Sequence, residues 1–418
     1  MERYSEYKDS GVKWLGEIPS HWELRKMKYT FSERSQKGFP QEPLLASTQT
    51  HGVILKSQYE NRTVEAIKSL ETLKLVEIGD FVISLRSFQG GLEYAYNRGI
   101  ISPAYTILTP THIKADYFKY LSKSDIFISL LKSTVTGIRE GQNIDYNKLK
   151  DNLLPIPSAK EQISIGSYLD SATSEIDKAI AMQQKMIDLL NERKQIIIQN
   201  AVTKGLDENV EMKESGVEWI GKIPKHWEVR RGKFLFRVVN EYSTTGQEEL
   251  LTVSDRTGIT PRSMKNVNMF MSESLIGYKK CQKGDICSNI MWMWHGAVGV
   301  TEYNGVISPS YGVYRQIAVN YDNKYLDYML RLPRLVEVYG ICSTGLTESR
   351  LRLYPDDFMN IQFFIPPVEE QKSIVLQIQK QITDIEKSIR NAENLITLLQ
   401  ERKQIIINEV VTGKVRVS

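Results

Sequence analysis

The feature that most constrains this chain is an internal duplication. A 24-residue segment that begins at Lys8 (KDSGVKWLGEIPSHWELRKMKYTF) aligns with one that begins at Lys213 (KESGVEWIGKIPKHWEVRRGKFLF), and 14 of the 24 positions are identical. Shorter matches follow in the same order in both halves: Gly79-Asp80 with Gly284-Asp285, ISPAY at Ile101 with ISPSY at Ile307, Thr136-Gly137 with Thr344-Gly345, and LLNERKQIII at Leu189 with LLQERKQIII at Leu398. Because the offset drifts only from 205 to 209 residues, each copy is one complete structural unit, and the chain is a twofold repeat, not a solenoid.

Each copy contains a mixed region followed by a long uninterrupted helix. Short β-type runs and helical patches, separated by Gly and Pro turn signals, lead to a Pro-marked boundary before the helix. We therefore expect an α+β protein with two pseudo-symmetric mixed α/β domains, separated by a long antiparallel two-helix coiled coil. The expected bounds are residues 1–157 and 206–366 for the domains, 158–205 for the central spacer helix and 367–418 for the C-terminal spacer helix.

Both long helices carry a heptad pattern, with seam residues at alternating spacings of four and three. The central seam is Ile176, Ile180, Gln183, Ile187, Leu190, Lys194, Ile197 and Ala201; the C-terminal seam is Ile385, Ile389, Ala392, Ile396, Leu399, Lys403, Ile406 and Val410. Such a seam predicts helix pairing, and the simplest closure pairs the two helices with each other. The alternative is that they pair with another protein or with a second copy of the chain.

The helix ends also carry signals. Ser158 and Glu161 form a capping-box pattern at the start of the central helix. Gly205 and Gly413 follow the last helical residues, where glycine is the preferred C-terminal cap. About forty residues of helix span ~60 Å at ~1.5 Å per residue, so we expect a rigid strut between the domains.

Composition excludes several classes of protein. A net charge of +4, from 54 basic and 50 acidic residues, is too small for a protein that holds any duplex by bulk charge. The polar start and the lack of a run of ~18 apolar residues predict a cytoplasmic protein with no membrane span. The three cysteines align with Val76, Val82 and Thr134 of the first copy, so we expect packing positions, not a disulfide or a metal site.

The sequence contains no recognisable catalytic constellation. It lacks a phosphate-binding loop, a Gly-x-Gly-x-x-Gly turn and a His-Glu-x-x-His pair. His21 and His226 occupy one repeat position and are expected to tie down an N-terminal arm. Pro355-Asp356 with Glu370-x-Lys372 resembles a metal-nuclease pattern, but the lysine is missing from the first copy. We therefore predict no catalytic residue and no metal site.

Polar residues concentrate in two stretches of each copy whose sequences diverge while the surrounding frame repeats. Arg pairs with guanine edges, Gln and Asn pair with adenine, and Trp can wedge between bases, although for the two tryptophans a core position is equally expected. The predicted DNA-binding residues are Ser84, Arg86, Gln89, Arg139, Gln142, Asn143, Asn289, Trp292, Trp294, His295, Thr347, Arg350 and Arg352.

The whole chain resembles the specificity subunits of type I restriction–modification enzymes. The motif that carries the resemblance is a Thr-Gly…Ile-Pro…Glu-Gln boundary followed by a long helix with Glu-Arg-Lys-Gln-x-Ile-Ile, and it is present twice. Ser158 departs from the commoner Pro-Pro, which affects helix capping and not recognition.

The resemblance implies a non-catalytic DNA-recognition subunit. Each target recognition domain would read one half of a bipartite duplex target, and the helices would set the spacer and bind two modification subunits. Those subunits would carry S-adenosylmethionine and methylate adenine at N6, and restriction subunits would supply ATP- and Mg²⁺-dependent translocation and cleavage. No cofactor is expected on this chain. The alternatives are a self-contained DNA methyltransferase or nuclease with an unfamiliar active site, and a scaffold that binds only protein.

Overall fold

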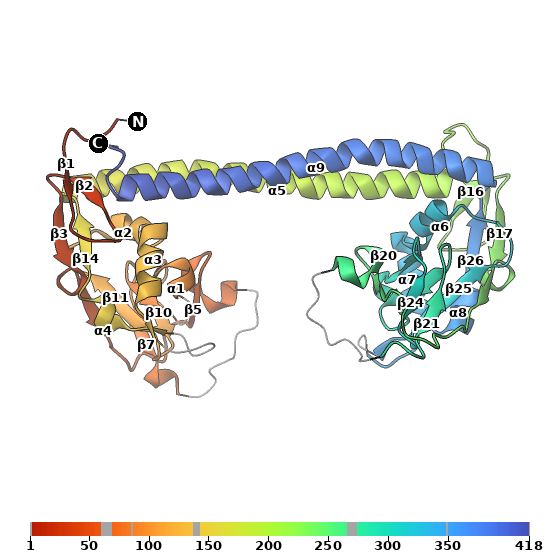
Figure 1. Cartoon of the computed structure of the whole chain (residues 1–418), viewed down its shortest axis with the longest axis horizontal. Helices are drawn as coiled ribbons and strands as arrows, with labels where there is room; N and C mark the ends of the chain where they lie inside the picture. Colours follow the sequence, from red (N-terminus) through yellow and green to blue (C-terminus); the bar gives the residue numbers. More distant parts are fainter. Residues whose placement is uncertain are drawn as a thin grey trace. The chain divides into compact units, whose positions relative to one another are not determined.

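The chain forms two compact units. In the computed structural model, residues 2–59, 69–84, 87–136, 143–265, 274–347 and 350–417 are described. The first unit comprises Met1–Lys185 with Ala392–Ser418, and the second comprises Met186–Asn391. Each unit therefore combines one mixed region with part of both long helices (Figure 1).

The mixed region of the first unit consists of short strands and short helices. Its helices are α1 (Ser87–Gly90), α2 (Ala115–Leu121), α3 (Asp125–Ser133) and α4 (Tyr146–Leu149). Its strands are β1 (Tyr7–Asp9), β2 (Glu17–Pro19), β3 (Glu23–Lys26), β4 (Phe31–Arg34), β5 (Leu45–Thr48), β6 (Gly52–Leu55), β7 (Lys74–Val76), β8 (Phe81–Ile83), β9 (Glu93–Tyr94), β10 (Gly99–Ile101), β11 (Thr106–Pro110), β12 (Val135–Thr136), β13 (Asn143–Ile144) and β14 (Leu153–Ile156).

The mixed region of the second unit has closely similar elements. Its helices are α6 (Asn323–Leu330), α7 (Pro333–Cys342) and α8 (Pro355–Asn360), with a 3₁₀ turn η7 (Met293–His295). Its strands are β15 (Met212–Glu214), β16 (Lys222–Pro224), β17 (Glu228–Arg231), β18 (Phe236–Val238), β19 (Leu251–Ser254), β20 (Gly258–Pro261), β21 (Lys279–Cys281), β22 (Ile286–Ser288), β23 (Val298–Val300), β24 (Gly305–Ile307), β25 (Gly312–Gln316) and β26 (Gln362–Ile365).

The strand pairing repeats between the units, as the duplicated sequence predicts. Each contains a four-stranded antiparallel sheet, with the order β4-β11-β8-β9 in the first and β18-β25-β22-β23 in the second. The smaller pairs also correspond: β1-β2 with β15-β16, β3-β14 with β17-β26, β5-β6 with β19-β20, and β7-β10 with β21-β24. The two copies therefore share the same order of paired strands, although many of their residues differ.

The core of each mixed region includes a tryptophan that the duplicated N-terminal segment contributes. Trp22 and Trp227 occupy equivalent repeat positions, and both are fully buried. Trp22 packs with Ile165 and Leu169 at the start of the central helix, while Trp227 lies 5.6 Å from Phe364 in a stacked arrangement. Cys281 and Cys287 are buried in a small apolar cluster, as their alignment with valines predicts.

The long helices are α5 (Ala159–Lys204) and α9 (Val368–Val411), and they pack together (Figure 1). In the first unit the start of α5 shares a core with the end of α9, and Lys403 forms an ion pair with Asp177 at 2.6 Å. In the second unit the end of α5 packs on the start of α9, and Lys194 pairs with Glu386 at 2.6 Å. The helices are therefore antiparallel within each unit.

The predicted seam faces inward. Ile176, Ile187 and Ile385 are buried. The other apolar seam residues that the heptad pattern predicts are half-buried: Ile180, Leu190, Ile197, Ile389, Ile396, Leu399 and Ile406. Both polar seam lysines gain carboxylate partners on the opposite helix. Since the helices of one chain bury this seam, no second protein is needed to cover it.

The ends of both helices match their sequence signals. The Ser158 backbone N–H donates to Glu161 Oε2 at 3.1 Å, and the Glu161 N–H donates to Ser158 Oγ at 3.3 Å, which is the reciprocal capping box. Gly205 and Gly413 adopt φ values of 77° and 75°, a conformation that favours glycine.

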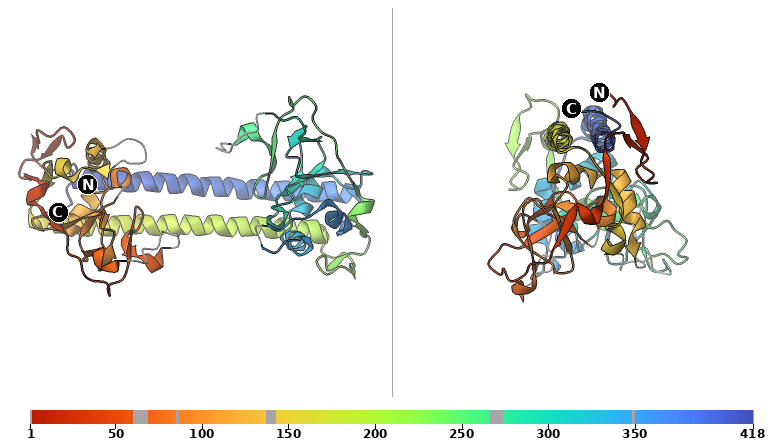
Figure 2. Two further views of the ribbon diagram at one scale, coloured as in Figure 1. Left: turned by 90° about the horizontal axis from the view of Figure 1, so that it is seen from below. Right: turned by 90° about the vertical axis from the view of Figure 1, so that its left-hand side faces the viewer.

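The two ends of the chain meet in the first unit. The Arg416 N–H donates to the Glu2 carbonyl at 2.9 Å, and Tyr7 donates through its hydroxyl to the Gly413 carbonyl at 3.0 Å. Figure 2 shows the N- and C-terminal ends lying together. Among the described residues, no helix has the length and apolar character needed to cross a membrane.

Candidate nucleic-acid interface

Each predicted reading loop follows a three-residue strand that starts directly after a buried, charged turn. Gly79 and Gly284 both adopt a φ of 92°, and the aspartates that follow, Asp80 and Asp285, are 2% and 0% exposed. Arg34 donates to both carboxylate oxygens of Asp80 (2.7 and 3.3 Å). Because β8 and β22 start directly after this turn and are each three residues long, a fixed turn sets where the strands begin and hence where the loops after them lie.

In the first unit the loop after β8 carries Ser84 and Gln89. Ser84 is half-buried, and its N–H donates to the Ser87 hydroxyl at 2.8 Å. Gln89 is exposed on α1, and its side-chain oxygen accepts from the Gln49 amide at 3.4 Å. Arg86 lies outside the described residues. Of the two described candidates, Gln89 is the one with an amide at the surface.

A buried ion pair holds α1 in place. Lys123 donates through Nζ to Glu93 Oε2 and to the Gly90 carbonyl, both at 2.8 Å. Glu93 is only 1% exposed, and burial raises its pKa, although the charge of Lys123 acts in the opposite direction. Lys123 thereby ties the end of α1 to the sheet.

In the second unit the corresponding loop carries an aromatic cluster. Trp292 stacks on Trp294 with ring centroids 6.0 Å apart and on His295 at 5.2 Å. Trp294 is half-buried and donates through Nε1 to the Met291 carbonyl at 3.0 Å, whereas Trp292 is 53% exposed and His295 is exposed. The two tryptophans therefore differ: Trp294 anchors the turn, and Trp292 presents a ring face to solvent.

Asn289 is placed differently from its predicted role at the surface. It is 8% exposed, its Nδ2 donates to the Tyr311 hydroxyl at 2.9 Å, and its Oδ1 accepts from the Met291 N–H at 3.1 Å. A side chain that is engaged at both ends shapes the loop, and base reading by Asn289 stays a prediction. The sequence could not reveal this, because Tyr311 lies 22 residues further along the chain.

The second pair of predicted stretches lies at a short antiparallel closure in each unit. In the first, β12 pairs with β13, where Thr136 faces Asn143; Arg139 and Gln142 lie outside the described residues, as does the side chain of Asn143. In the second, Thr344 bridges to Arg352. Thr347 and Arg350 are exposed, while Arg352 is half-buried and donates to the Leu351 carbonyl at 2.8 Å.

The histidines of the duplicated arm have a structural use. His21 lies 2.8 Å from Glu161 and His226 lies 2.7 Å from Glu370, and in each copy the following tryptophan donates through Nε1 to the same carboxylate. Glu370 is the glutamate of the nuclease-like pattern, and this contact explains its presence. No group of three or more metal-ligating side chains occurs within the described ranges.

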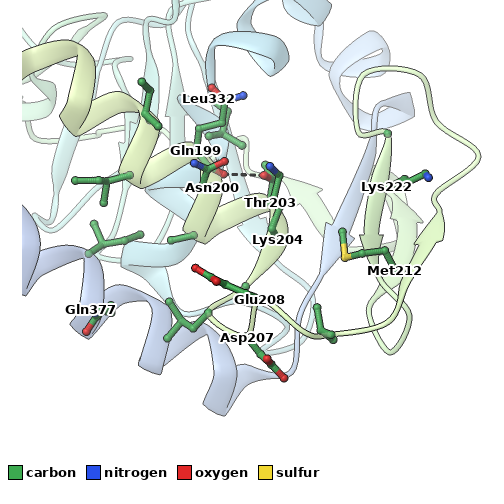
Figure 3. Close-up of a pocket in the computed structure, with 18 of the residues that line it drawn as sticks. Gln199, Asn200, Thr203, Lys204, Asp207, Glu208, Met212, Lys222, Leu332 and Gln377 are labelled. Carbon is green, nitrogen blue, oxygen red and sulfur yellow. Dashed lines mark hydrogen bonds between the residues drawn. The ribbon is translucent and has the colours of Figure 1, made fainter. Parts of the chain in front are cut away.

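A cavity of about 980 Å³ lies in the second unit, beside the end of α5. Figure 3 shows the lining, which includes Gln199, Asn200, Lys204 and Glu208, with Gln377 contributed by α9. None of its lining residues belongs to the divergent loops, and it contains no histidine or cysteine. The cavity lies at the junction between the end of α5 and the segment that follows it.

The structure also reveals exposed polar turns outside the predicted DNA-binding stretches. The turns of the β5-β6 and β19-β20 hairpins each expose three consecutive polar residues, at 49–51 and 255–257. The available signal was their divergence, Gln-Thr-His against Asp-Arg-Thr, in front of a glycine that both copies share.

Similarity to known proteins extends over nearly the whole chain. A Methanocaldococcus jannaschii protein with the provisional name type I restriction enzyme MjaX specificity subunit is 24% identical over 465 residues, covering 98% of this chain and 98% of the relative. The type I restriction enzyme MjaVIII specificity subunit of the same organism is 23% identical over 361 residues, covering 82% of this chain and 80% of the relative. No family model matches the chain.

The fold is shared with a solved structure. A chain from a structure that describes complex assembly and conformational transition of the type I R-M system aligns with a TM-score of 0.69 at 14% identity, and the match covers 95% of this chain and 99% of that chain. The relatives in sequence and the solved structure with a similar fold thus both come from type I restriction systems.

Proposed function

We propose that this chain is the sequence-recognition subunit of a type I restriction–modification enzyme and has no catalytic role of its own. The observation that carries the proposal is one frame, present twice, with polar loops that diverge at corresponding places. A duplicated enzyme would keep its reactive groups in both copies, whereas a reader of two different half-sites keeps its frame and changes its loops. The near full-length similarity to specificity subunits supports the same conclusion.

In this proposal each mixed domain reads one half of a bipartite duplex target. Gln89 in the first domain, and Trp292, His295, Thr347 and Arg350 in the second, are the described candidates that reach the surface. Their side chains can bond or stack with base edges. Asn289 and Trp294 position the loop of the second domain.

The partners follow from the helices. Met186, Leu189 and Ile196 on α5 are 49%, 55% and 51% exposed, and the equivalent residues of α9, Leu395, Leu398 and Ile405, are 42%, 61% and 55% exposed. Exposed apolar stripes of this kind mark interaction surfaces. Two equivalent stripes suit two copies of one partner, and we assign them to two modification subunits.

The chemistry resides on those partners. S-adenosylmethionine would be held by the modification subunits, and ATP and Mg²⁺ by restriction subunits. The chain would act in the cytoplasm, where it meets DNA and these subunits.

Exchange of one domain tests the proposal. Replacing residues 206–366 with those of a relative, in a strain that supplies the modification subunits, should change one half of the methylated motif and leave the other half intact. Genome-wide mapping of N6-methyladenine measures both halves at once. If both halves changed, or neither did, the modular assignment would be refuted.

A second experiment addresses the enzyme alternative. The purified chain, incubated with DNA, S-adenosylmethionine and Mg²⁺, should show neither methylation nor cleavage, and it should bind duplex DNA with an affinity that falls as salt rises. Turnover without partners would contradict the proposal, and so would a complete lack of salt-sensitive duplex binding.

A further inference from the structure

The hairpin turns at residues 49–51 and 255–257 have matching flanking residues in the two copies, but their own three residues differ. We call them the first turn and the second turn. In each, three exposed residues lie between a hydroxyl residue that ends a strand and a buried glycine that starts the next, with φ values of 71° at Gly52 and 64° at Gly258. Both glycines are in the left-handed region, which non-glycine residues rarely adopt. Thr48 pairs with Gly52 and Ser254 pairs with Gly258, so both hairpins close at the same register around three turn residues.

A cation from a different element holds each turn. Lys123, which follows α2, donates through Nζ to the Gln49 carbonyl at 3.4 Å. Arg331, which follows α6, donates through its guanidinium to the carbonyls of Asp255 at 2.6 Å and Arg256 at 2.9 Å. Lys123 and Arg331 are equivalent repeat positions, and so are Gln49 and Asp255. The contact is therefore a duplicated latch that acts on the backbone and leaves the turn side chains to vary.

Each turn lies beside the predicted reading loop of its own domain. In the first unit the Gln49 amide nitrogen is 3.4 Å from Gln89 Oε1, and Lys123 also holds the Gly90 carbonyl at the end of α1. In the second unit strand β20, which starts at Gly258, packs against β23, the strand that follows the Trp292 loop. Turn and loop thus belong to one surface in each domain.

The side chains on these turns are suited to base edges. The Arg256 guanidinium makes no hydrogen bond or ion pair with the residues that the structure describes, and an arginine pairs in bidentate fashion with guanine O6 and N7. In the first turn, His51 Nδ1 engages the Thr50 hydroxyl at 2.8 Å, which leaves Nε2 directed elsewhere. A turn with a purely structural role needs neither an unpaired guanidinium nor a latch confined to backbone atoms.

We propose that the first and second turns are specificity-determining elements, each of which reads at least one base pair of its half-site, with Lys123 and Arg331 as positioning residues. This rests on the proposed function, and it adds to the recognition surface a loop that sequence reasoning did not single out. Arg256 reads a guanine in the half-site of the second domain.

Transplanting one turn into the other copy is the direct experiment, because both frames accept the same backbone. In the full chain with its modification subunits, Asp255→Gln, Arg256→Thr and Thr257→His are combined, so that the second domain carries the first turn. We expect N6-methyladenine mapping to show an altered base preference within the second half-site and an unchanged first half-site. Retention of the original motif at full methylation would overturn the proposal.

A single substitution defines the position that is read. Arg256→Ala should lower discrimination for guanine at one position by about tenfold to a hundredfold, measured by competition binding with duplexes that vary each base pair in turn. Arg230→Ala, which removes the same charge from strand β17 of the same unit, is the matched control and should leave every preference unchanged. If Arg256→Ala weakened all sequences equally and reduced the salt dependence of binding, the residue would contact phosphate, and the proposal would be refuted.

The positioning role of Arg331 can be distinguished from a contribution to stability alone. Arg331→Ala should lower discrimination at the same base pair as Arg256→Ala, and the double variant should lose no more than either single variant. Arg331→Lys should restore part of the discrimination, since a lysine still reaches carbonyl groups. A loss of thermal stability with unchanged discrimination would show that Arg331 only supports the fold.

These outcomes remain separate from those of the proposed function. If the unmodified chain directs no methylation and binds no duplex, the proposed function fails. If it does both, and the turn variants keep the original motif, only the assignment of the turns fails.

Discussion

At the scale of single residues, the buried aspartate of the Gly-Asp turn pairs with an arginine in both copies. The arginine lies on a different strand in each copy. Arg34 lies on β4 in the first copy, whereas in the second copy Arg315 lies on β25 and donates to both oxygens of Asp285 at 2.7 and 2.8 Å. The position equivalent to Arg34 is the buried Val239, and the position equivalent to Arg315 is Thr109. The carboxylate needs a bidentate cation, and the frame supplies it from either neighbour.

This exchange predicts a rescue. Arg34→Val leaves the Asp80 carboxylate without its cation and should cost about 3 kcal/mol of unfolding free energy. Adding Thr109→Arg reproduces the arrangement of the second copy and should restore most of that loss, as measured by urea denaturation. Arg25→Val, at an exposed arginine paired with Glu23, is the control and should change stability by no more than about 0.5 kcal/mol. A double variant no more stable than Arg34→Val would contradict this account.

The Glu161 carboxylate, which holds the N-terminal arm through His21 and Trp22, predicts a pH dependence of stability. Burial acts to raise the pKa of Glu161, but hydrogen bonds from His21 and Ser158 outweigh it, so the pKa lies below the ordinary value of 4.5. A lowered carboxyl pKa contributes stability above the unfolded value, and that contribution is lost as pH falls through the folded one. Glu161→Gln should therefore lower the melting temperature at pH 7.

The difference between Glu161→Gln and the parent chain should shrink as pH falls below about 4.5, the ordinary pKa of the carboxyl. Glu192→Gln, at an exposed position of α5, should leave the pH profile of the melting temperature unaltered. A constant difference from pH 7 to pH 3 would show that the ionised carboxylate is not what stabilises the arm.

At the scale of elements, the long helices were predictable and the recognition surface was predictable only in part. Heptad spacing, the Ser158 capping box and the terminal glycines are local signals, and α5 begins and ends within one residue of its expected bounds. The α9 helix begins one residue after its expected start but ends at Val411, seven residues before the expected end at 418 and two before the Gly413 cap. Strand pairing and loop roles depend on distant contacts. The burial of Asn289 depends on Tyr311, and the latch on the second turn depends on Arg331, 76 residues from Asp255. Neither contact leaves a local pattern in the sequence.

A charge placed in the exposed apolar stripe of either long helix should reduce the number of bound modification subunits. Leu398→Glu places a charge in the α9 stripe, at a side chain that is 61% exposed, and should leave the melting temperature nearly unchanged because no core contact is removed. Burying that charge against a partner is costly, so the purified complex should retain one modification subunit instead of two. Native mass spectrometry of the co-expressed complex measures this directly.

Leu189→Glu is the matched variant on α5 and should have the same effect, whereas the double variant should retain neither subunit. Gln400→Glu introduces the same charge at an exposed position of α9 outside the stripe, and it should leave the stoichiometry intact. If the double variant still bound two modification subunits, the exposed apolar stripes would not be the surfaces that bind them.

At the scale of the whole molecule, the proposed function makes the helix length a ruler for the DNA spacer. Removal of residues 183–189 and 391–397 takes one heptad from each helix and leaves the ion pairs Asp177–Lys403 and Lys194–Glu386 in place. Seven residues correspond to about 10 Å of helix, which is about three base pairs at ~3.4 Å each. The methylated motif should therefore keep both half-sites and lose about three base pairs between them.

The same deletion should also slow methylation. It shortens the protein and the DNA spacer by similar distances, but it rotates the two domains and the two half-sites by different angles. Three base pairs rotate the duplex by about 100°, at 10–10.5 base pairs per turn, whereas a heptad shifts the helix phase by only about 20°. The second domain would then face its half-site from a direction rotated by roughly 80° about the duplex axis, so methylation should be slower as well as respaced. Removing the heptad from α9 alone should instead break the seam register and lower the melting temperature. An unchanged spacer in the double deletion, with methylation intact, would show that the helices do not set the distance between the half-sites.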